Sequence, residues 1–205
     1  MAFWGAPVPQ EDHAIRACLA ALDNQSRLVE LRKEFTRMGL PPVHARIGIN
    51  TGEMIIGNMG STQRFDFTVI GDSVNLASRL EGAGKEYGAS IIISEETYRQ
   101  AQNKVEVREL DLLQVKGKDR PIRIYELLAR KGEIDHAALR KLDLFAQGLG
   151  MYRNRQWTEA ICCFENVLTL DAHDGPAKTF LERCQQFHKN PPGLDWKGVH
   201  RLLRK

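Results

Sequence analysis

Apolar side chains at helical spacing mark the first long element of the chain. They are Ile15, Cys18, Leu19, Leu22, Leu28 and Leu31. Residues that recur every three to four positions present one apolar face of a helix, so this pattern predicts a helix over residues 11–38. Gly39 is suited to end that helix, and Pro41 and Pro42 prevent its continuation.

Stretches in which apolar and polar residues alternate predict strands. Residues 43–51 alternate in this way, with four apolar residues on one side: Val43, Ala45, Ile47 and Ile49. Successive side chains of a strand point to opposite faces of a sheet, so this stretch is expected to lie with one face buried. Residues 1–4 have the composition of the end of an apolar strand, and we expect them to pair with residues 43–51.

The remaining elements of the first 130 residues are short and mixed in type. Further strands are expected over residues 53–57, 65–70, 90–93, 105–115 and 121–128, and helices over residues 72–87 and 95–102. The last two strands are expected to form a hairpin around residues 116–119. Long helices combined with mainly antiparallel strands predict an α+β sheet domain over residues 1–130.

The segment after the Lys131-Gly-Glu linker is expected to be helical throughout, as a second unit over residues 133–205. Helices are expected over residues 139–152, 157–170 and 175–187. Four small and aromatic positions are similar to the anchors of a tetratricopeptide repeat: Gly148, Tyr152, Ala160 and Phe164. One and a half repeats cannot bury a groove, so this tail is expected to pack on something else. A helical cap on the sheet domain explains the pattern equally well.

Composition and charge exclude several classes of function. The 205 residues carry 29 basic and 26 acidic side chains, a net charge of +3, and 42% are hydrophobic. A nucleic-acid-binding protein would show a clustered basic surface, and a spanning helix would need about 20 apolar residues; the sequence has neither pattern. The four cysteines show no metal-ligand spacing, so reduced thiols in a cytoplasmic protein are expected.

Candidate chemistry is concentrated in residues 65–79. Alternation is expected to bury Phe65, Phe67 and Val69 and to turn Asp66 and Thr68 to the opposite face. Asp72 or Ser73 is suited to cap the next helix.

Asn75 and Arg79 are four residues apart and share a face of that helix. A strand hydroxyl, an amide and a guanidinium suit a ligand that carries a base, a sugar and phosphates. A helical Asn/Arg pair is more often only a solvated face.

Three segments resemble motifs of class III nucleotidyl cyclases, in the order that the family has them. They are Met-Ala-Phe-Trp-Gly-Ala-Pro at residues 1–7, Ala45-Arg-Ile-Gly-Ile-Asn-Thr-Gly52, and Thr68-Val-Ile-Gly-Asp-Ser-Val-Asn-Leu-Ala-Ser-Arg79. The resemblance covers residues 1 to about 128. The tail is similar to the C-terminus of bacterial sensor-linked adenylate cyclases. The resemblance implies a ferredoxin-like cyclase fold that lacks its N-terminal elements.

The family resemblance also implies a role for individual residues. It implies a head-to-tail homodimer with two composite sites that convert ATP to cyclic AMP and pyrophosphate. By resemblance, Asn75 would position the ribose, Arg79 would stabilise the transition state at the α-phosphorus, and Thr68 would contact the purine. Arg46 of the neighbouring protomer and Lys116 would bind the triphosphate.

Each of these residues also has a simpler explanation. Arg46 could pair with a nearby carboxylate, and Lys116 could belong to a soluble hairpin tip. Thr68 is a common strand residue. Because its hydroxyl both donates and accepts, it cannot by itself distinguish adenine from guanine.

The resemblance implies Mg²⁺ or Mn²⁺ bound by two aspartates near the start of the domain, and both would precede residue 1. Asp12, Asp23 and Asp66 have neither the strand context nor the spacing to replace them. The chain is therefore expected to be a fragment that is inactive alone. Two other functions stay open: a non-catalytic dimerisation or regulatory module, and a helical-repeat module that binds a protein partner through residues 133–205.

Overall fold

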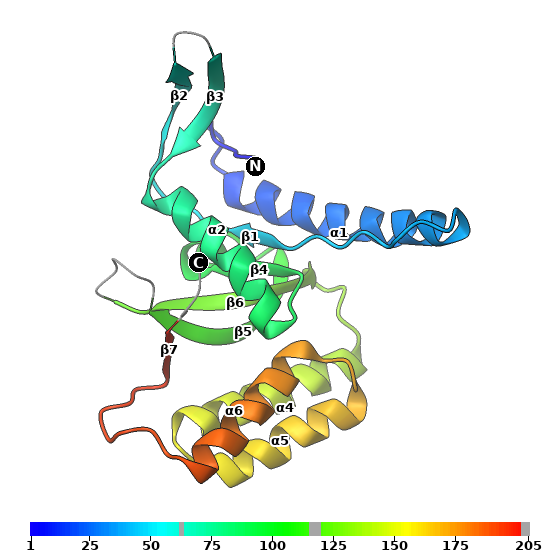
Figure 1. Ribbon diagram of the computed structural model, residues 1–205, viewed down its shortest axis with the longest axis vertical. Coiled ribbons are helices and arrows are strands. Elements are labelled where there is room, and N and C mark those ends of the chain that lie inside the picture. The colour runs from blue at the N-terminus through cyan, green and yellow to red at the C-terminus, as the bar shows by residue number, and fades with distance from the viewer. Residues whose placement is uncertain (62–63, 115–119, 202–205) are drawn as a thin grey trace.

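A five-stranded sheet forms the centre of the protein (Figure 1). The structure is a computed structural model that describes residues 1–61, 64–114 and 120–201. In spatial order the strands are β1 (Ile47–Ile49), β4 (Ile91–Ser94), β6 (Ile122–Arg130), β5 (Val105–Gln114) and β7 (Val199–Arg201). The β4–β6 and β5–β6 pairs are antiparallel, whereas β1–β4 and β5–β7 are parallel. The predicted α+β class is confirmed.

Helices cover both faces of this sheet. Side chains of β4 alternate between the two faces, so Ile91 and Ile93 belong to one apolar cluster and Ile92 to another. The first cluster is completed by α1 (His13–Arg37) and α3 (Glu95–Ala101). The second is completed by α2 (Asp72–Tyr87) and by the C-terminal helices. The predicted helices of the first 130 residues are all present, within two residues of their expected ends.

The backbone of β1 lies directly against the backbone of α2. A Cβ atom added at Gly48 would be 2.1 Å from the carbonyl oxygen of Ala77 and 2.3 Å from the amide nitrogen of Glu81. No side chain fits in this space, so the closeness of strand and helix depends on glycine. Asn50, just beyond β1, donates from Nδ2 to the carbonyl oxygen of Ser73 at 3.0 Å and ties the strand end to the start of α2.

We therefore expect Gly48→Ala to lower the free energy of unfolding by about 1–3 kcal/mol, the range for overpacking a well-filled site. Urea denaturation measures the change. Gly82→Ala is the matched control, because Gly82 lies in α2 with nothing near its missing Cβ. Gly82→Ala is expected to stabilise the protein by up to about 1 kcal/mol through helix propensity. Equal effects of the two variants would contradict the close packing of β1 on α2.

A two-stranded hairpin projects from one end of the molecule (Figure 1). It consists of β2 (Ile55–Ser61) and β3 (Arg64–Ile70), paired antiparallel and separate from the main sheet. Val69 is buried as predicted, but the prediction for Phe67 is wrong, since 58% of this residue is exposed. The physical reason is that the hairpin extends beyond the sheet and has no layer to cover this face. The side chain of Phe65 lies outside the described part of the structure.

The predicted pairing of residues 1–4 with residues 43–51 is wrong. Residues 1–4 are irregular, and Phe3 lies beside Phe67 of the hairpin with a ring-centroid distance of 6.1 Å. Residues 43–46 are irregular too, so that only Ile47–Ile49 of this stretch forms a strand. The side-chain amide of Gln25 in α1 donates to the carbonyl oxygen of Ala45 at 2.8 Å. The backbone here is bonded to a helix side chain, which removes it from the ladder.

Three helices follow the sheet: α4 (His136–Arg153), α5 (Trp157–Leu170) and α6 (Gly175–Lys189). The prediction of three tail helices is confirmed, whereas the prediction that the tail is helical throughout is wrong, because β7 pairs with β5. The apolar residues of the tail share one cluster with α2 and the sheet. Within the described residues, no helix is long and apolar enough to cross a membrane.

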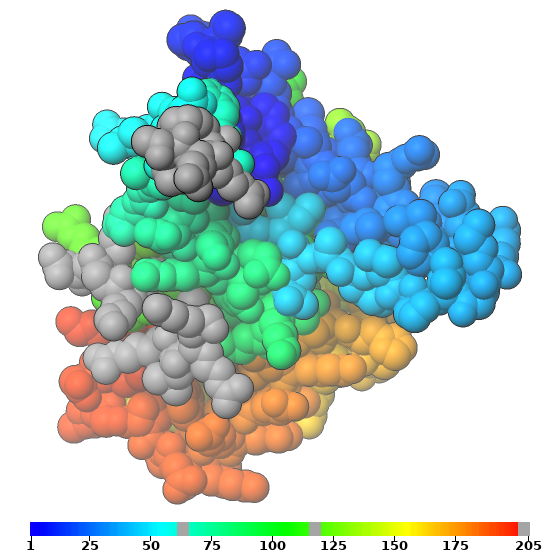
Figure 2. All heavy atoms as spheres, turned by 45° about the horizontal axis from the view of Figure 1, so that its top comes forward, coloured from blue at the N-terminus to red at the C-terminus, as the bar shows by residue number. Residues whose placement is uncertain are grey.

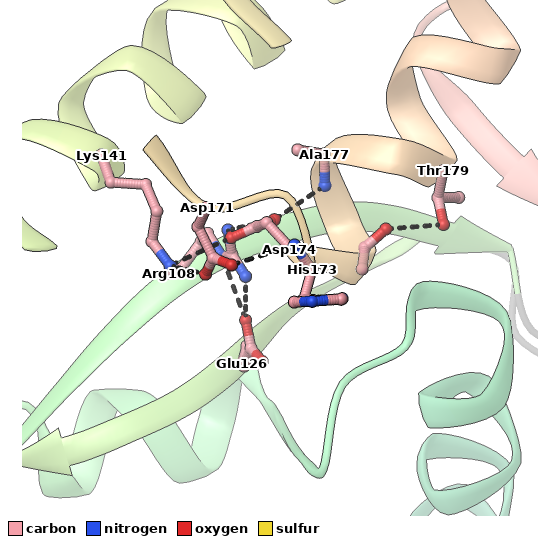
Figure 3. A network of polar contacts seen from close by, with 9 residues as sticks. Arg108, Glu126, Lys141, Asp171, His173, Asp174, Ala177 and Thr179 are labelled. Carbon is pink, nitrogen blue, oxygen red and sulfur yellow. Dashed lines mark hydrogen bonds and ion pairs between the residues drawn. The ribbon is translucent and has the colours of Figure 1, made fainter. Parts of the chain in front are cut away.

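A buried polar network joins the tail to the sheet (Figure 3). The guanidinium of Arg108 in β5 donates to both carboxylate oxygens of Asp174 at 2.9 and 2.7 Å, and to Glu126 of β6 at 3.0 Å and 2.5 Å. Asp174 also caps α6 by accepting from the amide nitrogen of Ala177 at 2.9 Å. Lys141 of α4 lies 3.3 Å from Asp174. One carboxylate thus connects a strand and two helices.

Candidate active site

Asn75 and Arg79 lie in the N-terminal half of α2, on its outward side. Asn75 is exposed and Arg79 is half-buried. A neighbouring side of the helix is buried through Leu76, Leu80 and Tyr87. The structure therefore places the amide and the guanidinium on one accessible face, as the four-residue spacing predicts. Figure 2 shows the surface of α2, in green, between the hairpin and the tail.

The start of α2 differs from the sequence prediction. Gly71 occupies the N-cap position, and no side chain caps the helix there, although Asp72 or Ser73 was expected to do so. The amide nitrogens of Val74 and Asn75 donate to the Gly71 carbonyl at 3.1 and 3.2 Å. Because β3 ends at Ile70 and α2 begins at Asp72, a single residue links the hairpin to the helix. The hairpin and the face that carries Asn75 are thereby fixed close together along the chain.

Thr68 lies on β3, opposite Gly57 in the hairpin register, and is half-buried. It is three residues before Gly71, the glycine at the start of the helix, so its hydroxyl is carried by the strand that leads into α2. Lys116 lies outside the residues that the structure describes. The predicted trio of Thr68, Asn75 and Arg79 therefore comes from one continuous strand–turn–helix unit.

Arg46 makes an ion pair within its own chain. Its Nε lies 3.1 Å from Oε1 of Glu81, and both side chains are more than 40% exposed, at 44% and 42%. The simpler explanation for Arg46, pairing with a carboxylate, is thus realised in this structure. Exposed pairs of this kind contribute roughly 0–1 kcal/mol, so Arg46 can leave Glu81 at little cost. Sequence reasoning missed Glu81, which lies 35 residues away.

Arg46 lies beside one face of α2, and Arg79 of the same chain lies on a different face of that helix. Arg46 borders a groove beside β1 whose α2 wall consists of Ser73, Val74, Ala77, Ser78 and Glu81. With about 100° of rotation per residue, Asn75 and Arg79 lie more than about 100° around the helix axis from the middle of that wall. The structure therefore does not bring Arg46 together with Asn75 and Arg79 within one chain.

The carboxylates of the described residues do not form a metal site. Across residues 1–61, 64–114 and 120–201, no group of three or more His, Cys, Asp or Glu side chains is placed to hold a metal ion. Asp12 is bonded to Arg16 at 2.6 Å, and Asp23 to Arg130 at 2.6 Å. Asp66 and Asp72 also have interaction partners. The donor set that Mg²⁺ or Mn²⁺ needs is not assembled by these residues.

The fold and these motifs are similar to those of known cyclases. The chain is 39% identical over 127 residues to "Adenylate cyclase 1" of Rhizobium meliloti (strain 1021), a match that covers 62% of this chain and 19% of the relative. The adenylyl cyclase CyaB from P. aeruginosa is 33% identical with a TM-score of 0.56, covering 64% of this chain and 68% of that one. The guanylyl cyclase Cya2 is 35% identical with a TM-score of 0.57, covering 64% and 66%.

The chain spans about a fifth of the length of the Rhizobium meliloti relative, 19%. The sequence model of the Adenylate and Guanylate cyclase catalytic domain matches residues 1–129, which include β1, the hairpin and α2. This matched region contains Arg46, Thr68, Asn75 and Arg79. More than half of the chain is therefore accounted for by one family, whose members are lyases, and the chain belongs to the adenylate and guanylate cyclase catalytic domain family.

Proposed function

We propose that this chain supplies the transition-state side of an adenylate cyclase site, which converts ATP to cyclic AMP and pyrophosphate. The observation that carries the proposal is the outward face of α2, where Asn75 and Arg79 lie directly after the strand that bears Thr68. An amide and a guanidinium beside a strand hydroxyl match the ribose, phosphate and base of a nucleotide.

In the proposed reaction, the 3′-oxygen of the ribose attacks the α-phosphorus in line. A new P–O bond forms as the bond to the β-phosphate breaks, the hydroxyl proton is lost, and pyrophosphate leaves. Asn75 holds the ribose so that the 3′-oxygen faces the phosphorus. Arg79 donates to the α-phosphoryl oxygens, where negative charge develops in the transition state. Thr68 contacts the purine.

The proposed site is shared between two chains arranged head to tail. Arg46 acts on the triphosphate bound at the Asn75 side of the neighbouring protomer. The separation of Arg46 from Asn75 and Arg79 around α2 supports this assignment, because one chain cannot direct all three at one nucleotide. The weak pair with Glu81 leaves Arg46 able to turn towards a substrate. Lys116 is proposed to bind the triphosphate from the Asn75 side.

The choice of ATP follows the names of the Rhizobium meliloti and P. aeruginosa relatives. The similar Cya2 is a guanylyl cyclase, and a threonine hydroxyl accepts a hydrogen bond from adenine or donates one to guanine. Selectivity must therefore involve more than Thr68. When bound, Mg²⁺ or Mn²⁺ neutralises phosphate charge; the described residues provide no site for it.

The test compares two polypeptides. The first is the 205-residue chain, which we expect to form no detectable cyclic AMP from ATP with Mn²⁺ or Mg²⁺, because its described residues assemble no site for a metal ion. The second, the extended domain, places residues 1–205 after the part of the Rhizobium meliloti catalytic domain that precedes the matched region. We expect it to form cyclic AMP, measured beside GTP turnover under the same conditions.

Three outcomes would each contradict a part of the proposal. A folded, dimeric extended domain that turns over neither nucleotide would show that residues 1–205 do not complete a cyclase site. Clear turnover by the 205-residue chain that is lost in its Arg79→Ala variant would overturn the expected inactivity of the chain alone and would mean that it contains its own metal ligands. Preference for GTP over ATP would overturn the purine assignment and leave the reaction class in place.

A further inference from the structure

The tail meets the C-terminal end of α2, the helix whose N-terminal half carries Asn75 and Arg79. Gly88, with φ +65°, ends α2, and Gly175 begins α6. A Cβ atom on Gly175 would be 2.6 Å from the carbonyl oxygen of Tyr87 and 2.8 Å from the Cα of Gly88. The backbones of the two helices are therefore in direct contact, which is possible only because neither contact residue has a side chain.

Polar contacts from α6 reinforce this junction. Thr179 Oγ1 donates to the carbonyl oxygen of Glu86 at 2.9 Å. Arg183 donates to the Glu86 carboxylate and, at 2.7 Å, to Oδ2 of Asp111 in β5. The Asp111 side chain is fully buried, and Tyr87 donates to the same oxygen at 2.6 Å. The single side chain of Arg183 thus links α6 both to α2 and to the sheet.

The surroundings of Arg183 make this link specific. Only 12% of its side chain is exposed, and its guanidinium lies over the rings of Tyr87 and Phe180 at 5.1 and 5.2 Å from their centroids. Burial raises the pKa of Tyr87 well above its ordinary value, and the charge of Asp111 adds to this effect. Tyr87 therefore stays protonated and keeps its hydrogen bond to Asp111. Hydrogen bonds to a charged group are about twice as strong as neutral ones.

Two of the three tail helices pack against the sheet domain. α4 packs against β5, α6 packs against α2, and α5 packs against α4 and α6. Asp174, the cap of α6, is itself held by Arg108 of β5, so the start of α6 is fixed to the sheet just where it meets α2 (Figure 3). The faces of α4 and α6 that pack on β5 and α2 are thus covered by the sheet domain of the same chain.

We propose that residues 133–205 are a positioning element that clamps the C-terminal end of α2, with Arg183 as its central contact, and so holds Asn75 and Arg79 in place. The clamp acts over about 10 Å, since Arg79 precedes Glu86 by seven residues at about 1.5 Å per residue. An α-helix transmits a displacement over this length as a rigid body. That the held residues act on a nucleotide rests on the function proposed above, whereas the clamp itself does not.

The test is hydrogen exchange in the 205-residue chain. Arg183→Met keeps most of the side-chain volume but removes the charge and the donors. We expect the amides of residues 74–87 to exchange about tenfold faster or more, the scale for losing one charge-assisted hydrogen bond. Arg183→Lys is expected to restore part of the protection. Arg155→Met is the matched control, because Arg155 donates to the carbonyl oxygens of Pro192 and Gly193 within the tail.

A second pair of variants avoids exposing a buried carboxylate. Thr179→Val removes the donor to Glu86, and Thr169→Val is its control, since Thr169 donates to Glu165 within α5. We expect faster exchange in residues 74–87 for Thr179→Val only. Exchange that rises equally in α2 and in β5 and β6, or that changes only in residues 84–90, would overturn the clamp.

Activity separates the clamp from the proposed function. In the extended domain, Arg183→Met is expected to lower kcat severalfold with KM little changed, because the substrate contacts remain and their alignment is lost. If exchange is faster in Arg183→Met but the unsubstituted extended domain has no cyclase activity, the proposed function is contradicted and the clamp is not. Full activity of Arg183→Met together with unchanged exchange would remove the clamp and leave the proposed function.

Discussion

Arg79→Ala is expected to lower kcat of the extended domain by on the order of 100-fold or more, the scale for removing a preorganised donor at developing charge. KM should change little, because the guanidinium is proposed to act on the transition state more than on bound ATP. Initial rates of cyclic AMP formation over a range of ATP concentrations measure both constants. Arg99→Ala is the control: Arg99 is an exposed arginine paired with Glu96 at 2.6 Å on α3.

Mixing two inactive variants tests the proposed sharing of the site between chains. In a heterodimer of Arg46→Ala and Arg79→Ala, one site has both arginines and the other has neither. Random pairing makes half of the dimers mixed, so about a quarter of the wild-type sites should return. Thr68→Ala should instead change KM or the preference for ATP over GTP. If heterodimers form and activity does not return, Arg46 and Arg79 do not act across the dimer.

Asp174→Ala is expected to lower the free energy of unfolding by about 3–5 kcal/mol, the cost of leaving one partner of a buried ion pair without the other. The Asp174 side chain is 1% exposed and accepts two hydrogen bonds from Arg108, whose own side chain is 6% exposed. The substitution leaves Arg108 with Glu126 alone among these contacts and removes the cap of α6. Urea denaturation followed by circular dichroism measures the loss.

Two controls separate the cap from the buried charge. Asp135 caps α4 by accepting from Ala138 at 2.7 Å and is exposed, so Asp135→Ala should cost only about 1 kcal/mol. Asp174→Asn keeps a good capping side chain and loses the charge. Its loss of unfolding free energy should therefore fall between the losses of the two alanine variants. If Asp174→Ala and Asp135→Ala cost the same, the ion pairs of Arg108 do not hold the tail on the sheet.

Local patterns predict the long elements of this chain well. The apolar spacing of residues 11–38 marks α1, and the strand–glycine–helix pattern of residues 65–87 marks β3 and α2. In both cases the residues that decide the structure are neighbours in sequence. The placement of Asn75 and Arg79 on one face follows from helical geometry alone, and this is the part of the candidate site that sequence reasoning predicts.

The errors about the sheet and the tail concern pairing between distant residues. Residues 1–4 have strand-like composition, but no ladder forms there, because Phe3 packs beside Phe67 of the hairpin. β7 has no apolar alternation to mark it, and its position follows from the path of the tail to the edge of β5. Arg108 and Asp174 are 66 residues apart and carry no local sign of their contact. Their partnership depends on how two packed units meet, which single-residue patterns do not contain.

The five-stranded sheet ends on both sides in a strand of only three residues, β1 and β7. An unpaired strand edge is a template for another chain, and a very short edge offers few consecutive amide and carbonyl groups. The long strands β5 and β6 lie inside the sheet, although β7 pairs only with Leu112–Gln114 of β5. Addition of another molecule at β1 or at β7 would form few ladder hydrogen bonds, which opposes growth of the sheet at these two strands.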